Sequence, residues 1–89
     1  MIVTIKRNFS KEFAKLPNNY KLKINEVLKV LESSENLQES GLDFVKLLPN
    51  KNYYRIRVGI YRIGLEYINP DIILITVFHR QDDYKSFPK

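Results

Sequence analysis

The chain has 89 residues, and its 15 lysines and arginines exceed its 10 aspartates and glutamates, so the formal net charge is +5. This length fits one domain over residues 1–89 and leaves no room for a second. The lack of cysteine excludes a disulfide framework, a thiol nucleophile and a cysteine zinc site, and one histidine makes a histidine metal site implausible. We therefore expect neither a metal nor another cofactor.

The apolar stretches are too short to span a membrane. At the N-terminus the charges of Lys6 and Arg7 follow the apolar residues, which is the reverse of a signal peptide. These features predict a cytoplasmic protein without a membrane partner.

The first part of the chain predicts a strand followed by two helices. Residues 2–7 are rich in β-branched side chains, which favour a short strand. A short helix is expected over about residues 10–16, capped by Asn8 or Ser10 and stopped by Pro17. A longer helix is expected next, because apolar residues recur at helical spacing: Tyr20, Ile24, Val27, Leu28 and Leu31. The short link between the helices predicts an antiparallel helical hairpin.

The second part changes to a period of two after a polar, irregular stretch over residues 36–52. Three strands are expected, over residues 53–58, 61–68 and 72–78. Gly59 and the Asn69–Asp71 segment are turn signals, so the strands form an antiparallel meander. The predicted fold is α+β, with the helical hairpin on one face of the sheet. The residues expected to be largely buried are Val27, Leu28, Leu31, Ile56, Ile63, Leu65, Ile73, Ile75 and Val77.

The positive charge is concentrated where acidic residues are missing, between Asp43 and Glu66. The basic residues of this segment are Lys46, Lys51, Arg55, Arg57 and Arg62, and Tyr53, Tyr54 and Tyr61 lie among them. Cations contact phosphates and tyrosine rings stack on unpaired bases, so the pattern favours a nucleic acid partner. The competing interpretation is a solvated strand face whose arginines provide solubility.

The meander brings distant cations together. The end of its third strand lies near the start of the second and the end of the first, so Arg57, Arg62 and Arg80 are expected to converge, with room for His79. Two other interpretations stay open at this point. Arg62 can pair with Glu66 on its own strand face, and His79 can be a strand-end histidine that is satisfied by the backbone.

The segments Tyr54–Ile63 and Val77–Tyr84, preceded by a short strand and a helical hairpin, resemble the RelE/ParE superfamily of bacterial and archaeal toxins. The resemblance covers essentially the whole chain. It implies an α+β fold and a type II toxin-antitoxin system, in which a cognate antitoxin neutralises the toxin.

For RelE-like members the implied activity is ribosome-dependent cleavage of mRNA without a metal, in which the 2′-hydroxyl of the RNA attacks the adjacent phosphate. The implied partners are the antitoxin, the ribosome and mRNA, and no small-molecule substrate is expected. The residues that we expect to be catalytic are Arg57, Arg62, His79, Arg80 and Tyr84, and those expected to bind RNA are Lys46, Lys51 and Arg55. Among them, Arg62 and Arg80 would hold the scissile phosphate, His79 would transfer a proton, and Tyr84 would stack on a base or assist the leaving oxygen.

The chain departs from the best-known RelE pattern where Arg55 and Arg57 replace lysines. Arginine stays protonated and is a poor general base, which leaves the base open and directs attention to His79. Two other functions remain: a ParE-like toxin that binds DNA gyrase without nuclease activity, and a degenerate homologue that only binds its antitoxin or operator complex. The arginine cluster with Tyr84 favours the nuclease, because a gyrase binder does not need to clamp a phosphate.

Overall fold

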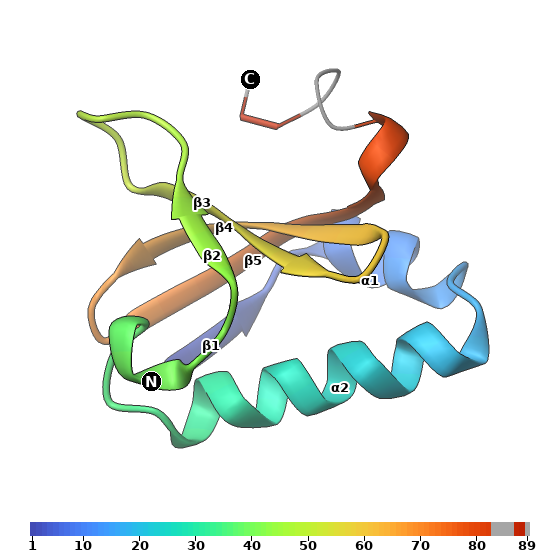
Figure 1. The fold of residues 1–89 in the computed structure, drawn as a ribbon, viewed down its shortest axis with the longest axis horizontal. Coiled ribbons are helices and arrows are strands. Elements are labelled where there is room, and N and C mark those ends of the chain that lie inside the picture. The colour runs from blue at the N-terminus through green and yellow to red at the C-terminus, as the bar shows by residue number, and fades with distance from the viewer. Residues whose placement is uncertain (83–86, 89) are drawn as a thin grey trace.

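The computed structural model describes residues 1–82 and 87–88, which form a five-stranded sheet and two α-helices (Figure 1). The elements in chain order are β1 (Ile2–Ile5), α1 (Arg7–Ala14), α2 (Asn18–Ser33), β2 (Phe44–Lys46), β3 (Tyr53–Val58), β4 (Tyr61–Ile68) and β5 (Asp71–His79). Short 3-10 turns cover Gln38–Ser40 and Arg80–Asp82. The predicted α+β class is confirmed.

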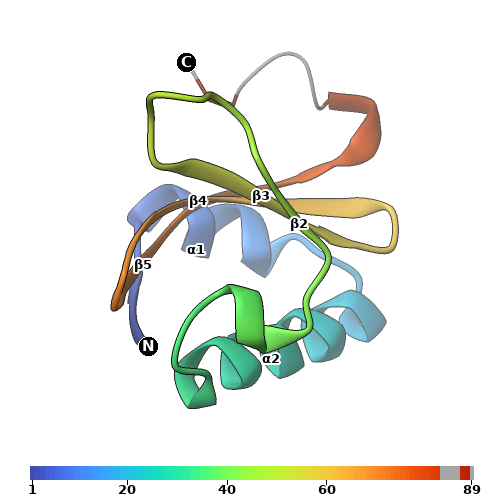
Figure 2. The same cartoon turned by 60° about the vertical axis from the view of Figure 1, so that its left-hand side comes forward.

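The sheet has the strand order β1-β5-β4-β3-β2. The strands β3, β4 and β5 form the expected antiparallel meander, and β2 continues it by pairing antiparallel with β3. The first strand, β1, pairs parallel with β5, so the sheet is mixed. Figure 2 shows α2 on one side of the sheet and the 3-10 turn Arg80–Asp82 on the other. The opposite face is therefore left without a helix.

One strand was not expected. Residues 36–52 were predicted to be irregular, but Phe44–Lys46 pairs with β3. Three residues are too few to display a strand period, and their pairing depends on the finished edge of β3. The strand matters for the site because it brings the residue just before it, Asp43, next to Arg57.

Neither helix has a side-chain cap, although Asn8 or Ser10 was expected to cap the first. Helix α1 begins at Arg7 without a side-chain cap, and the Asn8 amide donates instead to Glu12 Oε1 at 2.9 Å. Helix α2 follows Pro17, whose carbonyl oxygen accepts hydrogen bonds from the N–H groups of Tyr20 and Lys21 at 3.0 Å each.

Within the described residues, neither helix is long and apolar enough to cross a bilayer.

The core lies between the helices and the covered face of the sheet. Of the residues predicted to be buried, six are buried: Val27, Leu31, Ile56, Ile63, Leu65 and Val77. Leu28, Ile73 and Ile75 are only half-buried. Ile73 pairs with Glu66 in register, and Ile75 lies where the pairing of β4 and β5 is shifted, because Gly64 pairs with Thr76 and Leu65 with Leu74. A shifted register changes which side chains face the core.

Helix α1 also closes an edge of the sheet. Because β1 ends at Ile5, the last part of β5 has no strand beside it on that side. There, Glu12 Oε1 accepts hydrogen bonds from the Thr76 hydroxyl at 2.6 Å and from the Val77 N–H at 3.3 Å. The carboxylate thus takes the place of a neighbouring strand.

Candidate functional site

Three arginines gather on the face of the sheet that the helices leave uncovered. In the register of β3 and β4, Arg57 lies directly opposite Arg62, and Arg55 lies opposite Gly64. Side chains alternate along a strand, so these three share one face, while Ile56 and Ile63 point into the core. The arginines line a depression of about 190 Å³, together with Asp43 and Val45.

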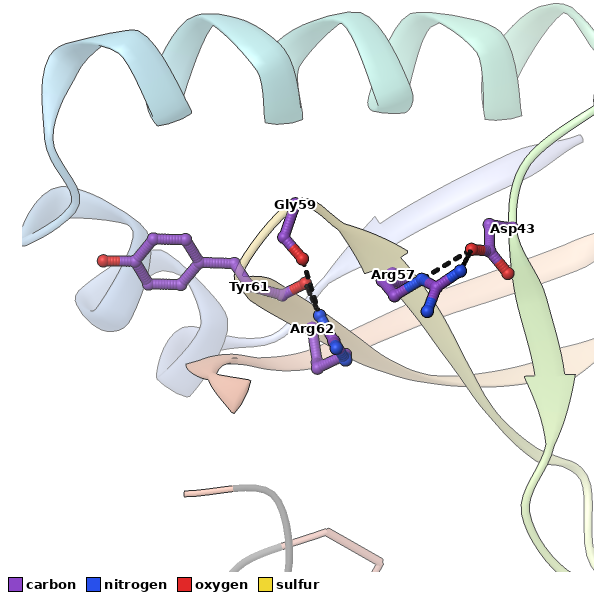
Figure 3. Close-up of polar contacts among 5 residues, drawn as sticks. All are labelled: Asp43, Arg57, Gly59, Tyr61 and Arg62. Atoms are coloured by element: carbon purple, nitrogen blue, oxygen red, sulfur yellow. Dashed lines mark hydrogen bonds and ion pairs between the residues drawn. The ribbon is translucent and has the colours of Figure 1, made fainter. Parts of the chain in front are cut away.

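Asp43 forms an ion pair with Arg57 at the edge of this depression. Both Nε and Nη2 of Arg57 lie 2.6 Å from Asp43 Oδ2, and the Arg57 N–H donates to the Asp43 carbonyl oxygen at 2.8 Å (Figure 3). The two side chains are 61% and 58% exposed, so water screens the pair and its contribution to stability is at most about 1 kcal/mol. A phosphate can therefore compete for Arg57.

The side chain of Arg62 is held against the turn between β3 and β4. Its Nη1 donates to the carbonyl oxygens of Gly59 at 2.9 Å and Tyr61 at 3.0 Å (Figure 3). Gly59 has a φ of +59°, and a Cβ there would lie 2.6 Å from the Tyr20 hydroxyl oxygen, so only glycine fits this turn without strain. Between Arg62 and Glu66, both described, there is no ion pair.

His79 does not join the arginines. It lies directly opposite Tyr61, whose ring packs on Tyr20 of α2 with 4.7 Å between the centroids, and its own ring is 5.6 Å from that of Tyr61. Tyr61 and Arg62 are consecutive in β4 and face opposite ways, so His79 is on the helix side of the sheet. Its Nδ1 accepts a hydrogen bond from the Gln81 N–H at 3.1 Å. The expectation that His79 joins the patch is wrong, because the register places it on the other face.

Arg80 lies beside the same turn as Arg62. Its backbone N–H donates to the Ile60 carbonyl oxygen at 2.8 Å, and the residue is exposed at the start of the last 3-10 turn. The backbone of Arg80 is thus close to the start of β4, as expected. Tyr84, the remaining residue that was expected to be catalytic, lies outside the described residues.

The two lysines that were expected to bind RNA lie away from the depression. Lys46 pairs with Tyr54 in register, on the face that includes the buried Ile56, and its Nζ is 6.0 Å from the centroid of the Tyr54 ring. Lys51 precedes β3, whereas Arg57 is near its other end, a separation of about 20 Å for an extended chain. Neither lysine adds charge to the arginine depression itself.

Phe87 packs on the uncovered face, against two residues next to Arg55. Gly64, which pairs with Arg55 and Thr76, faces the ring of Phe87, and a Cβ at Gly64 would lie 2.7 Å from both Phe87 Cδ2 and Thr76 Cγ2. Phe87 also makes an edge contact with Tyr53 at a centroid distance of 5.6 Å. This role of Gly64 was not predicted, although a glycine in the middle of a strand is itself a signal of close approach.

The family model that describes the ParE toxin of the type II toxin-antitoxin system parDE matches residues 3–84. The chain belongs to this toxin family. Toxin RelE3 of Methanocaldococcus jannaschii is 36% identical over 88 residues, which cover 99% of this chain and all of that protein. The expected membership of the RelE/ParE superfamily is thereby confirmed.

Solved structures give the same result for the fold. The RelB-RelE antitoxin-toxin complex from Methanococcus jannaschii contains a chain that is 34% identical, with a TM-score of 0.80 over 96% of this chain and 99% of that one. The archaeal RelE-RelB complex from Pyrococcus horikoshii matches at 24% identity, with a TM-score of 0.71 over 89% and 93% of the two chains. At that lower identity the likeness concerns the fold alone.

In this toxin, the described residues that line the depression combine three guanidinium groups with one carboxylate. Planar guanidinium groups bind phosphate oxygens in pairs of hydrogen bonds, and they stay charged at any physiological pH. Among the described residues, no group of three or more histidine, cysteine, aspartate or glutamate side chains could hold a metal ion. The arrangement suits a phosphate group and the charge that develops on it.

Proposed function

We propose that this toxin is a ribosome-dependent mRNA endonuclease and that the depression of Arg55, Arg57 and Arg62 receives the RNA backbone. The observation that carries the proposal is the direct pairing of Arg57 with Arg62 across two strands. Like charges that face each other in a sheet are destabilising. A polyanionic ligand would relieve this repulsion, and the relief would contribute to the free energy of binding.

The proposed reaction uses the 2′-hydroxyl of the RNA as its nucleophile, so the toxin has to position it and stabilise charge. Arg57 and Arg62 would bind the scissile phosphate as negative charge grows on its oxygens, and Arg55 would hold the neighbouring backbone. Arg80 would join them from the adjacent turn, and Tyr84 would stack on a base or assist the leaving 5′-oxygen. His79 could transfer a proton only if the RNA passed around the end of β5 to the other face of the sheet.

A cognate antitoxin is part of the proposal. The relative from Methanococcus jannaschii was solved as a RelB-RelE antitoxin-toxin complex. An antitoxin that carries acidic side chains to the exposed arginines would compete directly with RNA.

The second candidate is a gyrase-binding toxin without nuclease activity, which the ParE name of the family model favours. The name of the relative, Toxin RelE3, favours the first candidate. The two candidates differ in what they demand of the surface. Only the nuclease needs cations placed around a single phosphate, and the facing pair Arg57 and Arg62 meets that demand.

The deciding experiment is induction of the toxin in cells, followed by mapping of mRNA 5′ ends. We expect cuts in phase with codons for the wild type, and none for Arg62→Ala. The matched control is Arg7→Ala, which removes the same charge from exposed α1. Toxicity without RNA cuts, accompanied by DNA-damage signalling, would replace the nuclease proposal with the gyrase alternative.

A further inference from the structure

Among the described residues of the proposed site, none named so far accepts the proton of the 2′-hydroxyl. Arginine does not deprotonate in proteins, and His79 lies on the other face of the sheet. Of the described residues that line the arginine depression, Asp43 alone has a carboxylate. We propose that Asp43 is the general base of the reaction, an inference that rests on the proposed nuclease function.

The backbone fixes where Asp43 lies. It directly precedes β2, in which Phe44 pairs with Ile56, and its carbonyl oxygen accepts the hydrogen bond from the Arg57 N–H at 2.8 Å. The carboxylate is therefore next to the arginine that faces Arg62. A general base has to lie within hydrogen-bond reach of the proton that it removes, and a phosphate between the two arginines would bring the sugar to this edge.

The side chain is oriented for this task. Both contacts from the Arg57 guanidinium go to Oδ2 of Asp43, at 2.6 Å each. Within the part of the chain that the structure describes, Oδ1 has no hydrogen-bond partner. With 58% of the side chain exposed, RNA can reach this oxygen. Arg57 would then have two tasks, because it orients the base through one edge of its guanidinium and binds the phosphate with its remaining N–H groups.

The proton balance of the step is complete. Asp43 Oδ1 takes the proton of the 2′-hydroxyl while the O2′–P bond forms and the P–O5′ bond breaks. The leaving 5′-oxygen takes a proton from water, and Asp43 later returns its own proton to the solvent. The products are a 2′,3′-cyclic phosphate and a 5′-hydroxyl, and no oxidant, reductant or metal is consumed.

A simpler role for Asp43 makes the opposite prediction. Among the described residues, the charged groups that line the depression with it are Arg57 and Arg55 of β3 and Arg62 of β4, so its charge offsets part of their repulsion. If Asp43 only screened these cations, its removal would strengthen RNA binding and speed cleavage. If it is the base, its removal strengthens or preserves binding but slows cleavage.

The test is Asp43→Asn, which keeps an oxygen that accepts from Arg57 but removes the basic group. Single-turnover cleavage on purified ribosomes is compared with toxin binding to ribosomes that carry mRNA with a 2′-deoxy nucleotide at the scissile position. We expect cleavage to slow by about 10²- to 10⁴-fold, the usual contribution of a general base, with binding unchanged or tighter. Asp43→Glu, which restores a carboxylate, should recover part of the rate.

The matched control is Glu66→Gln, since Glu66 is an acidic residue of β4 outside the depression. The Glu66→Gln variant also loses one negative charge, as Asp43→Asn does, and its cleavage rate should be unchanged. Wild-type or faster cleavage by Asp43→Asn would overturn the inference in favour of screening, and a parallel loss of binding would reduce Asp43 to a group that positions Arg57. If the wild-type toxin leaves mRNA uncut in the same assay, the proposed function itself fails, and this inference with it.

Discussion

Arg57 and Arg62 face each other as direct neighbours across β3 and β4, on the side of the sheet without a helix. Such a pair costs stability unless an anion compensates it. In the isolated toxin, Asp43 compensates Arg57 and two backbone carbonyl oxygens accept from Arg62. The ion pair between Asp43 and Arg57 is exposed and weak, so a phosphate can exchange with the carboxylate.

Arg62→Ala should abolish cleavage without unfolding the toxin. Loss of one group that stabilises transition-state charge typically slows a reaction by about a hundred- to a thousand-fold. The free energy of unfolding should change little, because the removal of a facing like charge offsets the loss of the hydrogen bonds to Gly59 and Tyr61. Single-turnover assays and urea unfolding of the same preparations measure both quantities, and an Arg62→Ala toxin that cuts mRNA at the wild-type rate would move the active site elsewhere.

Leu31→Ala should destabilise the toxin more than Leu28→Ala. Leu31 is completely buried beneath the sheet, whereas Leu28 is half-buried and lines a groove between α1 and α2. Replacement of a fully buried leucine by alanine costs about 2–5 kcal/mol, and the cost is lower where the site is already open. Urea unfolding in an Arg62→Ala background avoids toxicity during expression, and equal costs at the two positions would contradict the observed burial.

Gly64→Ala should disturb the packing of the Phe87 ring against β4 and destabilise the toxin. A new Cβ would meet both Phe87 and Thr76 at 2.7 Å, so we expect a loss of about 1–3 kcal/mol, the usual cost of overpacking. In a Phe87→Ala background the cost should be smaller, but it should persist because Thr76 remains. A double-mutant cycle by urea unfolding measures this coupling. Strictly additive effects would mean that Phe87 does not rest on Gly64.

The affinity of the cognate antitoxin should fall as salt rises. The arginines of the depression are partly exposed, so salt screens their attraction for acidic side chains. At 0.1 M salt this attraction decays over a screening length of about 10 Å. Titrations at low and high salt with the wild type and with Arg55→Gln should show a shallower salt dependence for the variant. An affinity that does not change with salt would show that the antitoxin avoids this face.

Much of the fold could be predicted because its signals are local. The alternation in residues 53–58 and 61–68 reveals two strands, and the Gly59 turn between them makes the strands antiparallel neighbours. Helical spacing likewise places Ile24, Val27 and Leu31 on one buried face of α2. Alternation also puts Arg55 and Arg57 on the face opposite Ile56 before any tertiary contact is known.

The rest depended on where separate segments meet. The three-residue β2 has no period of its own, yet its pairing with β3 brings Asp43 to Arg57 across 14 positions of the chain. The face of His79 follows from the shifted register between β4 and β5, which no spacing along the sequence reveals. The sequence by itself therefore determined the helices, the meander and its row of arginines, because these follow from periods within one segment. Only the tertiary structure decided which carboxylate joins the arginines and which histidine does not, because strand pairing is fixed by packing between segments.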